Sequence, residues 1–344
     1  MAPLRIAIAG AGVIGRTHIR AALAEPACRL VGIADPDRAS LAAAPSAEVP
    51  RFADLPAMLD ATRPEAVILA TPNVLHVPMA LACIARSLPV LVEKPIADTV
   101  ADAAALTDTA ARAGVPVLVG HHRRHNPIIA RAREIIAGGR LGRVLTATVL
   151  CNLLKPDVYF DVVWRRQAGG GPVLINLIHE IDLLRHLLGE IAEVQALTAN
   201  LARGLAVEDS AAVLLRFAAG TLAAITLTDA AAAPWSWDLA AGENPAFRGA
   251  PAVSHMFAGT DASLSLPDLT LWQYPGARGW HAELAQETVA PAPADPYAAQ
   301  LRHFIAVARG AAAPLVSAAD ATRTLATTLA VHRAAQDGVR ACPD

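Results

Sequence analysis

The sequence predicts an α/β chain of two domains: a doubly wound parallel sheet, then an α+β domain with a large open, mainly antiparallel sheet. At 344 residues, the chain is too long for one small core. Short apolar runs alternate with helical segments as far as Val119, which is the βαβ pattern of a parallel sheet. Longer strand-like runs follow Gly142. We therefore expect one domain over residues 1–122 and another over residues 123–344.

Five strand-length apolar runs define the first sheet. The predicted strands are Leu4–Ala9, Leu30–Ala34, Ala66–Ala70, Pro89–Val92 and Val115–Val119. The predicted helices are Val13–Ala24, Leu55–Asp60, Val77–Ala85 and Ala101–Ala113. Because ligands of such sheets bind outside the carboxyl ends of the strands, the polar residues that follow these runs are candidate site residues.

A glycine-rich turn, GAGVIG, joins the first strand to the first helix. Its glycines would permit a tight turn, a close approach of the backbone to a pyrophosphate, and close packing of helix and strand. The helix N-terminus would attract the phosphates. This context predicts a Rossmann dinucleotide-binding domain, whereas the alternative is a glycine turn in an ordinary α/β sheet. The predicted contacts in the turn are Gly10, Gly12, Val13, Ile14 and Gly15.

Asp35 ends the second strand, and its position is typical of the carboxylate that binds the adenosine ribose hydroxyls. A carboxylate there repels a 2′-phosphate, which favours NAD. Arg38 lies three residues further on and could pair with that phosphate. The sequence therefore predicts NAD as the cofactor and leaves NADP open.

The later strands of the first sheet also end in polar residues. We expect these residues to line the cofactor at the same sheet edge. Glu93 would either pair with the charge of Lys94 or turn away from it. The predicted set is Thr71, Pro72, Asn73, His76, Glu93, Lys94, Pro95 and His122.

Lysine is nearly absent from the chain, since 27 of its 29 basic residues are arginine. Arginine replaces lysine well on a solvated surface, but not where a compact ammonium must lie beside a reacting oxygen. Lys94 and Lys155 are therefore candidate functional residues. Lys94 follows a buried strand, where an ammonium could lower the pKa of a substrate hydroxyl or stabilise an alkoxide. For Lys155, survival by chance is an equal alternative.

The second half has longer strands and one unusual helix. A triple glycine, 169–171, leads into an apolar helix expected over Val173–Arg185, which carries Asn176 and His179 three residues apart. A neutral histidine there could act as a general base, although a structural histidine is the alternative. Residues 231–252 are expected to form a loop. The predicted strands are Val144–Leu150, Glu193–Leu201, Ser210–Phe217, Thr221–Asp229, Val253–Phe257 and Ala262–Leu266, and the closing helices Pro296–Gly310 and Ser317–Gly338 could pack back on the first domain.

Together these motifs resemble those of the Gfo/Idh/MocA oxidoreductases, named for glucose–fructose oxidoreductase and inositol dehydrogenase. The resemblance covers nearly the whole chain. It implies a nicotinamide-dependent dehydrogenase that is a homodimer or homotetramer through the sheet of its second domain. It rests on the glycine turn with His18, on Thr71-Pro72-Asn73 with His76, on Glu93-Lys94-Pro95, on 120–124, and on the triple glycine with His179 and Asp182.

The resemblance implies that Lys94 and His179 lie by the reacting carbon of the substrate. Many polyol-oxidising members carry an aspartate four residues before the histidine, where this chain has Ile175, with Asn176 beside it. Asn176 could orient His179 but cannot relay a proton. Lys94 and His179 are therefore expected to share the acid–base work, and which of them is the principal proton acceptor stays open.

Substrate-binding candidates come from both halves of the chain. Five residues before the triple glycine would rim the pocket as donors to a sugar or polyol, or as cations for a carboxylate: Lys155, Tyr159, Trp164, Arg165 and Arg166. For Arg165 and Arg166, exposed surface is the alternative. The histidine-rich run 121–125 suggests a metal, but the resemblance implies a place beside the nicotinamide, so no metal is predicted. The predicted substrate-binding residues are Lys94, Arg123, Lys155, Tyr159, Trp164, Arg165, Asn176 and His179.

The leading functional hypothesis is NAD(P)-dependent oxidation of a secondary hydroxyl of a sugar, cyclitol or related hydroxy compound, or the reverse reduction. Hydride would pass to nicotinamide C4. One alternative is glycoside cleavage through transient oxidation by a tightly held NAD, and another is a nonenzymatic dinucleotide-binding sensor. The net charge of −2 gives no basic field for nucleic acid or a membrane surface. No leader or membrane span is expected, and the scattered cysteines suit a cytoplasmic protein.

Overall fold

The computed structural model describes residues 2–244, 246–289, 291–292 and 294–343. The chain divides into two compact units. Unit 1 comprises residues 2–125 and 295–325, and unit 2 comprises residues 126–294 and 326–343. Each unit is built on a sheet of its own, and the two sheets confirm the predicted fold class.

The sheet of unit 1 has six parallel strands in the order β3-β2-β1-β4-β5-β6. The order reverses between β1 and β4, which is the switch point where such sheets bind ligands. The short strand β3 was not predicted, because two residues carry no periodicity. The strands are β1 (Leu4–Ala9), β2 (Cys28–Ala34), β3 (Arg51–Phe52), β4 (Ala66–Leu69), β5 (Val90–Val92) and β6 (Val117–Val119).

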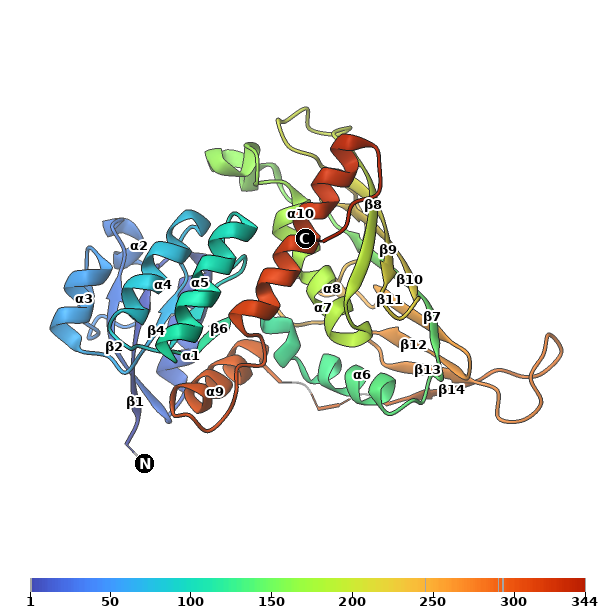
Figure 1. Ribbon diagram of the computed structural model, residues 1–344, viewed down its shortest axis with the longest axis horizontal. Coiled ribbons are helices and arrows are strands. Elements are labelled where there is room, and N and C mark those ends of the chain that lie inside the picture. The colour runs from blue at the N-terminus through green and yellow to red at the C-terminus, as the bar shows by residue number, and fades with distance from the viewer. Residues whose placement is uncertain (1, 245, 290, 293, 344) are drawn as a thin grey trace. The chain divides into compact units, whose positions relative to one another are not determined.

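Helices α4 and α5 lie side by side in unit 1 (Figure 1). Asp54 and Thr99 cap α3 and α5 by accepting backbone N–H groups, which explains where these helices begin. The chain returns to unit 1 late: Val119 N donates to Val316 O, and α9 packs against α1. The helices of unit 1 are α1 (Val13–Ala24), α2 (Arg38–Ala42), α3 (Leu55–Thr62), α4 (His76–Ile84), α5 (Val100–Ala113), α9 (Pro296–Ala308) and the first part of α10 (Ala318–Asp337).

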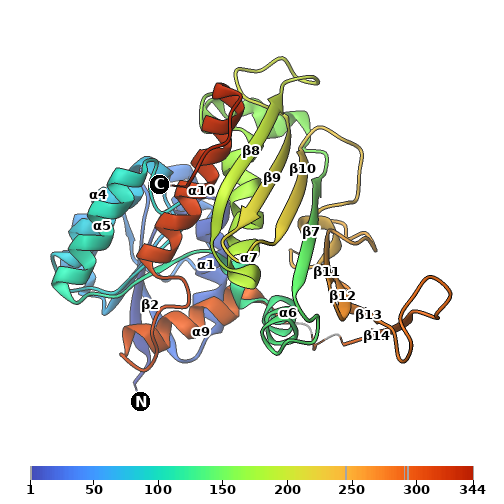
Figure 2. The same ribbon diagram turned by 45° about the vertical axis from the view of Figure 1, so that its right-hand side comes forward.

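The sheet of unit 2 has eight strands in the order β14-β13-β12-β11-β7-β10-β9-β8, most of which Figure 2 shows side by side. All neighbours pair antiparallel except β7 and β10, which pair parallel, so the sheet is mixed. The last two strands in the chain, β13 and β14, were not predicted, because each has only four residues. The strands are β7 (Val144–Asn152), β8 (Ile191–Ala199), β9 (Ser210–Phe217), β10 (Leu222–Thr228), β11 (His255–Gly259), β12 (Ala262–Leu266), β13 (Thr270–Gln273) and β14 (Ala285–Thr288).

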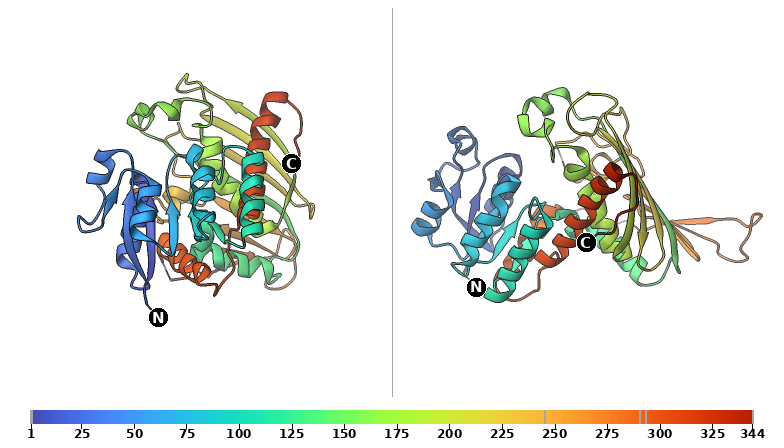
Figure 3. Two further views of the ribbon diagram at one scale, coloured as in Figure 1. Left: turned by 60° about the vertical axis from the view of Figure 1, so that its left-hand side comes forward. Right: turned by 45° about the horizontal axis from the view of Figure 1, so that its top comes forward.

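One face of this sheet forms the core of unit 2. Alternate side chains of β7, β9 and β10 pack there against α6 (Pro127–Ala137), α7 (Ile178–Leu188) and the end of α10. The right-hand view of Figure 3 shows the end of α10 against this sheet. The opposite face exposes large apolar side chains from five strands, namely Leu197, Leu214, Leu222, Met256 and Trp272.

The segment over residues 231–252 is not a continuous loop. A short helix, α8 (Trp237–Ala240), interrupts the loop expected over residues 231–252, because Ser236 caps it and Trp237 is fully buried. Among the helices described, none is both long and apolar enough to cross a membrane.

Candidate active site

The glycine turn of unit 1 has the shape that a dinucleotide requires. Gly10 has φ +98°, and a Cβ on it would lie 2.2 Å from Ala70 O. A Cβ on Gly15 would lie 2.0 Å from Gly10 O, so α1 approaches β1 closely. A Cβ on Gly12, by contrast, would meet no atom within 4 Å. The turn is therefore packed on its inner side and open at Gly12, where the helix begins.

The N-terminus of α1 faces solvent. No side chain caps it, and Val13 and Ile14 are exposed. Its first N–H groups are therefore directed to an open surface, where they and the helix dipole favour an anion. The residues present fit the pyrophosphate of a dinucleotide.

Asp35 braces the glycine turn. Its Oδ2 accepts from Ala11 N at 2.7 Å, and its Oδ1 accepts from Asp37 N at 2.8 Å. Each carboxylate oxygen keeps a second lone pair, so the half-buried group can still accept from ribose hydroxyls. Arg38 is exposed at the first position of α2. The structure thus keeps both residues that bear on the choice between NAD and NADP.

Asp35→Ala is expected to weaken binding of both dinucleotides, because the turn loses a brace, and to weaken NAD more than NADP. The ribose contact exists only with NAD, and a lost hydrogen bond to a charged group costs about 1.5–3 kcal/mol. Fluorescence titration with NADH and NADPH measures both effects. Asp37→Ala is the matched control, since this exposed carboxylate caps α2 instead. An equal loss for both cofactors in Asp35→Ala would refute the ribose contact.

Two turns at the carboxyl edge of the sheet are tied together by His76. Its Nδ1 lies 2.7 Å from Pro95 O, and its Nε2 lies 2.9 Å from Thr71 O. The ring is buried, at 1% exposed. His76 therefore holds the segment after β4 against the segment after β5, which contains Lys94. Pro72 and Asn73 lie between Thr71 and His76 in the sequence, and Asn73 begins a short 3₁₀ turn.

Glu93 is buried beneath this edge, where its carboxylate contacts His18 and the backbone of Lys94. His18 Nε2 donates to Glu93 Oε1 at 2.7 Å, and Lys94 N donates to Glu93 Oε2 at 3.3 Å. Burial raises the pKa of Glu93, but the hydrogen bond and charge of His18, with the charges of His122 and Lys94, outweigh it and hold the pKa below its usual value. Gly120 leaves the necessary room, because a Cβ there would lie 2.8 Å from the carboxylate.

Glu93→Gln is expected to lower the free energy of unfolding at neutral pH by about 1–3 kcal/mol, because a buried charge-assisted hydrogen bond is lost. The lowered pKa means that the ionised carboxylate stabilises the native state above its unfolded pKa. This stability is lost as the pH falls through the folded pKa. Urea unfolding at neutral pH and at low pH should therefore show a difference that shrinks in acid. Glu65→Gln, on an exposed carboxylate, serves as the control. A difference that grows in acid contradicts the assignment.

Lys94 follows β5 at the same edge as the glycine turn and Asp35. Its side chain is half-buried, whereas Glu93 and Pro95 on either side are buried. His122, on the 3₁₀ turn that follows β6, stacks on Tyr297 of α9 with ring centroids 4.4 Å apart. Arg123, predicted to bind substrate, is 2% exposed on the same turn. Unit 1 thus brings the predicted cofactor residues and Lys94 to one edge of one sheet.

In unit 2 the helix of His179 begins differently from the prediction. Residues Val173–Leu177 form a π-helical turn, and α7 begins only at Ile178. Such turns often occur at functional sites. Glu208 fixes the start, since its Oε1 accepts from Val173 N at 3.0 Å. A Cβ on Gly171 would lie 2.2 Å from that carboxylate, which explains why the third glycine precedes this helix. His179 is 8% exposed on the first turn of α7.

Lys155 lies beside this π-helical turn. Its Nζ donates to Asn176 Oδ1 at 2.7 Å and forms an ion pair with Asp229 Oδ2 at 3.0 Å. Burial lowers the pKa of Lys155, although the charge and hydrogen bond of Asp229 oppose this effect. Arg203 pairs with the other oxygen of Asp229. The structure therefore joins two predicted substrate residues, Lys155 and Asn176, through direct contact.

A second cation, Arg165, packs on the aromatic residues near Lys155. Arg165 lies over the Tyr159 ring at 3.9 Å, and its Nη1 donates to Tyr159 O at 2.8 Å. Trp164 is 48% exposed on the neighbouring 3₁₀ turn, Val163–Arg166. The guanidinium is thus held in place by a ring and a carbonyl, whereas Arg166 is exposed.

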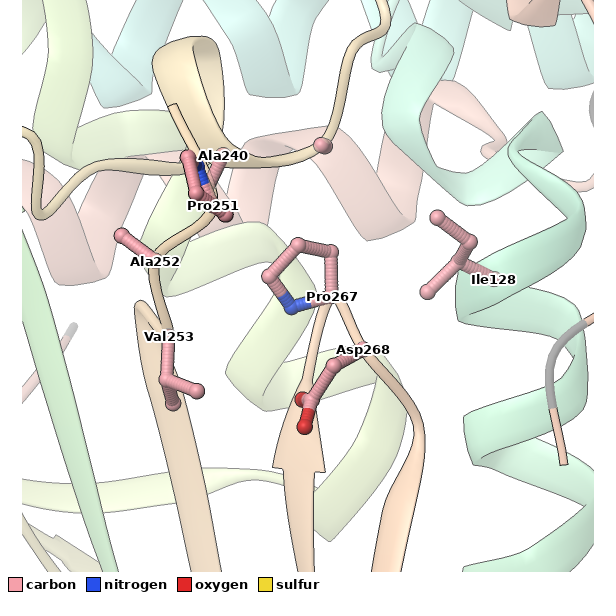
Figure 4. A pocket seen from close by; sticks show the side chains of 8 residues that line it. Ile128, Ala240, Pro251, Ala252, Val253, Pro267 and Asp268 are labelled. Atoms are coloured by element: carbon pink, nitrogen blue, oxygen red, sulfur yellow. The ribbon is translucent and has the colours of Figure 1, made fainter. Parts of the chain in front are cut away.

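A buried polar pair and a cavity of unit 2 lie apart from the predicted site residues. Glu180 Oε2 and His255 Nε2 lie 2.9 Å apart with both side chains 0% exposed, so these residues belong to the core. A cavity of about 420 Å³ lies between α6, α8 and the turn after β12 (Figure 4). Its lining is almost entirely apolar, with Asp268 as its one carboxylate. None of the predicted site residues lines it.

Several residues of these clusters were not predicted. Tyr297, Glu208 and Asp229 lie far along the chain from the groups they contact, and a single sequence carries no signal for such pairs. A weak signal existed for Tyr297, which is one of three tyrosines and directly follows the proline that begins α9. His18 stood in the glycine motif, but only the structure shows that it binds Glu93.

Both halves of the chain match models of known protein families. Residues 4–121 match the model of an oxidoreductase family with an NAD-binding Rossmann fold, and residues 129–246 match the GFO/IDH/MocA C-terminal domain. Inositol 2-dehydrogenase of Mycolicibacterium gilvum is 31% identical over 64% of this chain and 63% of its own length. 1,5-Anhydro-D-fructose reductase of Ensifer adhaerens is 36% identical over 46% of this chain and 49% of its own length. The chain thus spans only about half to two thirds of these relatives.

A solved structure extends the likeness over nearly the whole chain. The WlbA dehydrogenase of Bordetella pertussis, in complex with NADH and UDP-GlcNAcA, is 26% identical and has a TM-score of 0.79. The match covers 99% of this chain and 98% of that one. Because the two family models together match well over half of the residues, the chain belongs to the Gfo/Idh/MocA family of oxidoreductases.

Proposed function

We propose that this protein is an NAD(P)-dependent dehydrogenase that oxidises a secondary hydroxyl of a sugar, cyclitol or related hydroxy compound, or catalyses the reverse reduction. The observation that carries the proposal is the carboxyl edge of the unit 1 sheet, where Lys94 follows β5 at the same edge as an open glycine turn and Asp35. The names of the relatives agree, since one is an inositol dehydrogenase and another a sugar-derivative reductase.

In the proposed reaction, NAD would supply the hydride acceptor, held by the glycine turn and Asp35. Lys94 and His179 handle the proton of the hydroxyl. Glu93, fixed by His18, keeps its carboxylate against the backbone N of Lys94. Ile175 cannot take or give a proton, so no third acidic group is assigned.

The proposal is tested by incubating the purified protein with a panel of sugars, cyclitols, sugar acids and glycosides and with NAD or NADP. Formation of reduced nicotinamide is followed by its absorbance. Turnover with at least one hydroxy compound is the expected result. Release of sugar from a glycoside without net formation of NADH would instead show the glycoside-cleaving reaction, and NAD binding without any turnover would favour a sensor.

We propose in addition that a second copy of the chain covers the exposed face of the unit 2 sheet. That face presents Leu197, Leu214, Leu222, Met256 and Trp272, and an apolar patch of this kind marks an interaction surface. Leu214→Asp is expected to lower the oligomeric mass measured by light scattering. The variant should still unfold at a defined melting temperature as a monomer. An unchanged oligomer in this variant would refute the assignment.

A further inference from the structure

We propose that Lys155 fixes the amide of Asn176 so that Asn176 offers its NH₂ group to the substrate, and that the site therefore selects a substrate with an acceptor-only oxygen there. Such an oxygen belongs to a carboxylate or a carbonyl. The inference rests on the proposed function, because it concerns the substrate of that same reaction.

The direction of the Asn176 amide follows from its partner. Lys155 Nζ lies 2.7 Å from Asn176 Oδ1. An ammonium has three donors and no acceptor, so only the oxygen of an amide can face it. A reversed amide would place its NH₂ group against the ammonium, two donors in contact. Lys155 therefore decides which end of Asn176 is turned inward.

Lys155 is itself held by several groups of unit 2. Its ammonium pairs with Asp229 at 3.0 Å, and its backbone N donates to Asp229 O at 2.8 Å. Arg203 binds the other carboxylate oxygen of Asp229, and the Tyr159 ring lies 4.8 Å from Lys155 Nζ. The Lys155 side chain is 9% exposed. Its charge is thus committed to the protein, and it acts as a positioning residue.

The outward end of Asn176 is available. The side chain is half-buried, and among the described residues its one hydrogen bond is the one from Lys155. It lies on the π-helical turn, three residues before His179. The free end of the amide therefore offers a hydrogen-bond donor on the π-helical turn.

The free NH₂ group of Asn176 distinguishes between kinds of substrate oxygen. A hydroxyl can either donate or accept, so a polyol gains little from this donor. A carboxylate or carbonyl oxygen only accepts, so it pairs with the NH₂ group and would be repelled by an aspartate. The two sources of such an oxygen are a sugar acid and a keto sugar or keto cyclitol.

The experiment compares two pairs of probes by calorimetric titration, with the cofactor form that prevents turnover. D-Glucuronate and D-glucose are both titrated with NADH present. Scyllo-inosose is titrated with NAD⁺ present, and myo-inositol with NADH present. In at least one pair, the wild-type protein is expected to bind the compound with the carboxylate or ketone about tenfold or more tightly than its hydroxyl partner. Asn176→Asp is expected to erase that preference by weakening that member about ten- to hundredfold. The hydroxyl member should change less than about threefold.

Two further variants separate positioning from a merely structural effect. Lys155→Met frees the amide to rotate and should lose the same preference, while the double variant Lys155→Met/Asn176→Asp should lose no more than either single one. Asn244→Asp is the matched control, because its Oδ1 accepts from Ala246 N and keeps this role as a carboxylate. Cofactor binding and melting temperature verify that each variant is folded.

An unchanged ratio in Asn176→Asp overturns the inference, as does equal or absent binding of both members of each pair by the wild type. Additive losses in the double variant overturn the role of Lys155. Turnover is measured separately. Lack of turnover with the whole panel counts against the proposed function, whereas the affinity ratios still decide how Asn176 is oriented.

Discussion

Lys94→Arg is expected to lower kcat by about a hundredfold or more while NAD binding persists. The substitution keeps the positive charge but replaces a compact ammonium by a planar guanidinium, whose charge is delocalised and whose proton is not released in proteins. If Lys94 moves a proton or donates to the developing alkoxide, arginine can do neither in the same place. Steady-state kinetics with the substrate found in the panel measure the loss.

Lys94→Met and the cofactor titration complete this test. Methionine keeps the apolar stem and removes the charge, so comparison with arginine separates the loss of charge from the loss of the proton. NADH binding should stay within about threefold of wild type in both variants, because the glycine turn and Asp35 are proposed to hold the dinucleotide elsewhere on the sheet edge. Near-normal turnover in Lys94→Arg would remove Lys94 from the chemistry.

The parallel sheet and its site edge were predictable from sequence, because their signals are local. Apolar runs, the glycine spacing and Asp35 each lie within one βαβ unit, where strand, turn and helix are joined by short connections. The resulting prediction is confirmed for β1, β2, β4, β5 and β6 within two residues at each end. The lysine scarcity pointed to the same edge without any structural information.

The remaining features were not predictable, because they depend on contacts between distant segments. The Glu93–His18 pair joins residues 75 apart in sequence, and Lys155 meets Asp229 only because β7 and β10 lie side by side. The π-helical turn is set by Glu208 from a later loop, so the sequence of Val173–Leu177 alone suggests an ordinary helix. Lys155 illustrates the difference: its rarity predicted a role, and only its partners suggest which role.

His179→Ala is expected to lower kcat by about two to four orders of magnitude if His179 is the general base for the hydroxyl. The residue lies on the first turn of α7, directly after the π-helical turn, in a segment fixed by Glu208. His186→Ala is the matched control, because it removes a second buried histidine from the same helix and is expected to leave kcat within about threefold.

The pH dependence decides what His179 does. A general base must be deprotonated in the free enzyme, so the wild-type kcat/KM should fall on the acid side of its profile, and this limb should disappear in His179→Ala. A histidine that only supports the helix would lower kcat/KM by a similar factor at every pH and leave the shape unchanged. If the limb persists in His179→Ala but disappears in Lys94→Met, Lys94 is the principal proton acceptor. Because Ile175 offers no titrating group, a limb that survives both substitutions would require a base outside the residues assigned to the site.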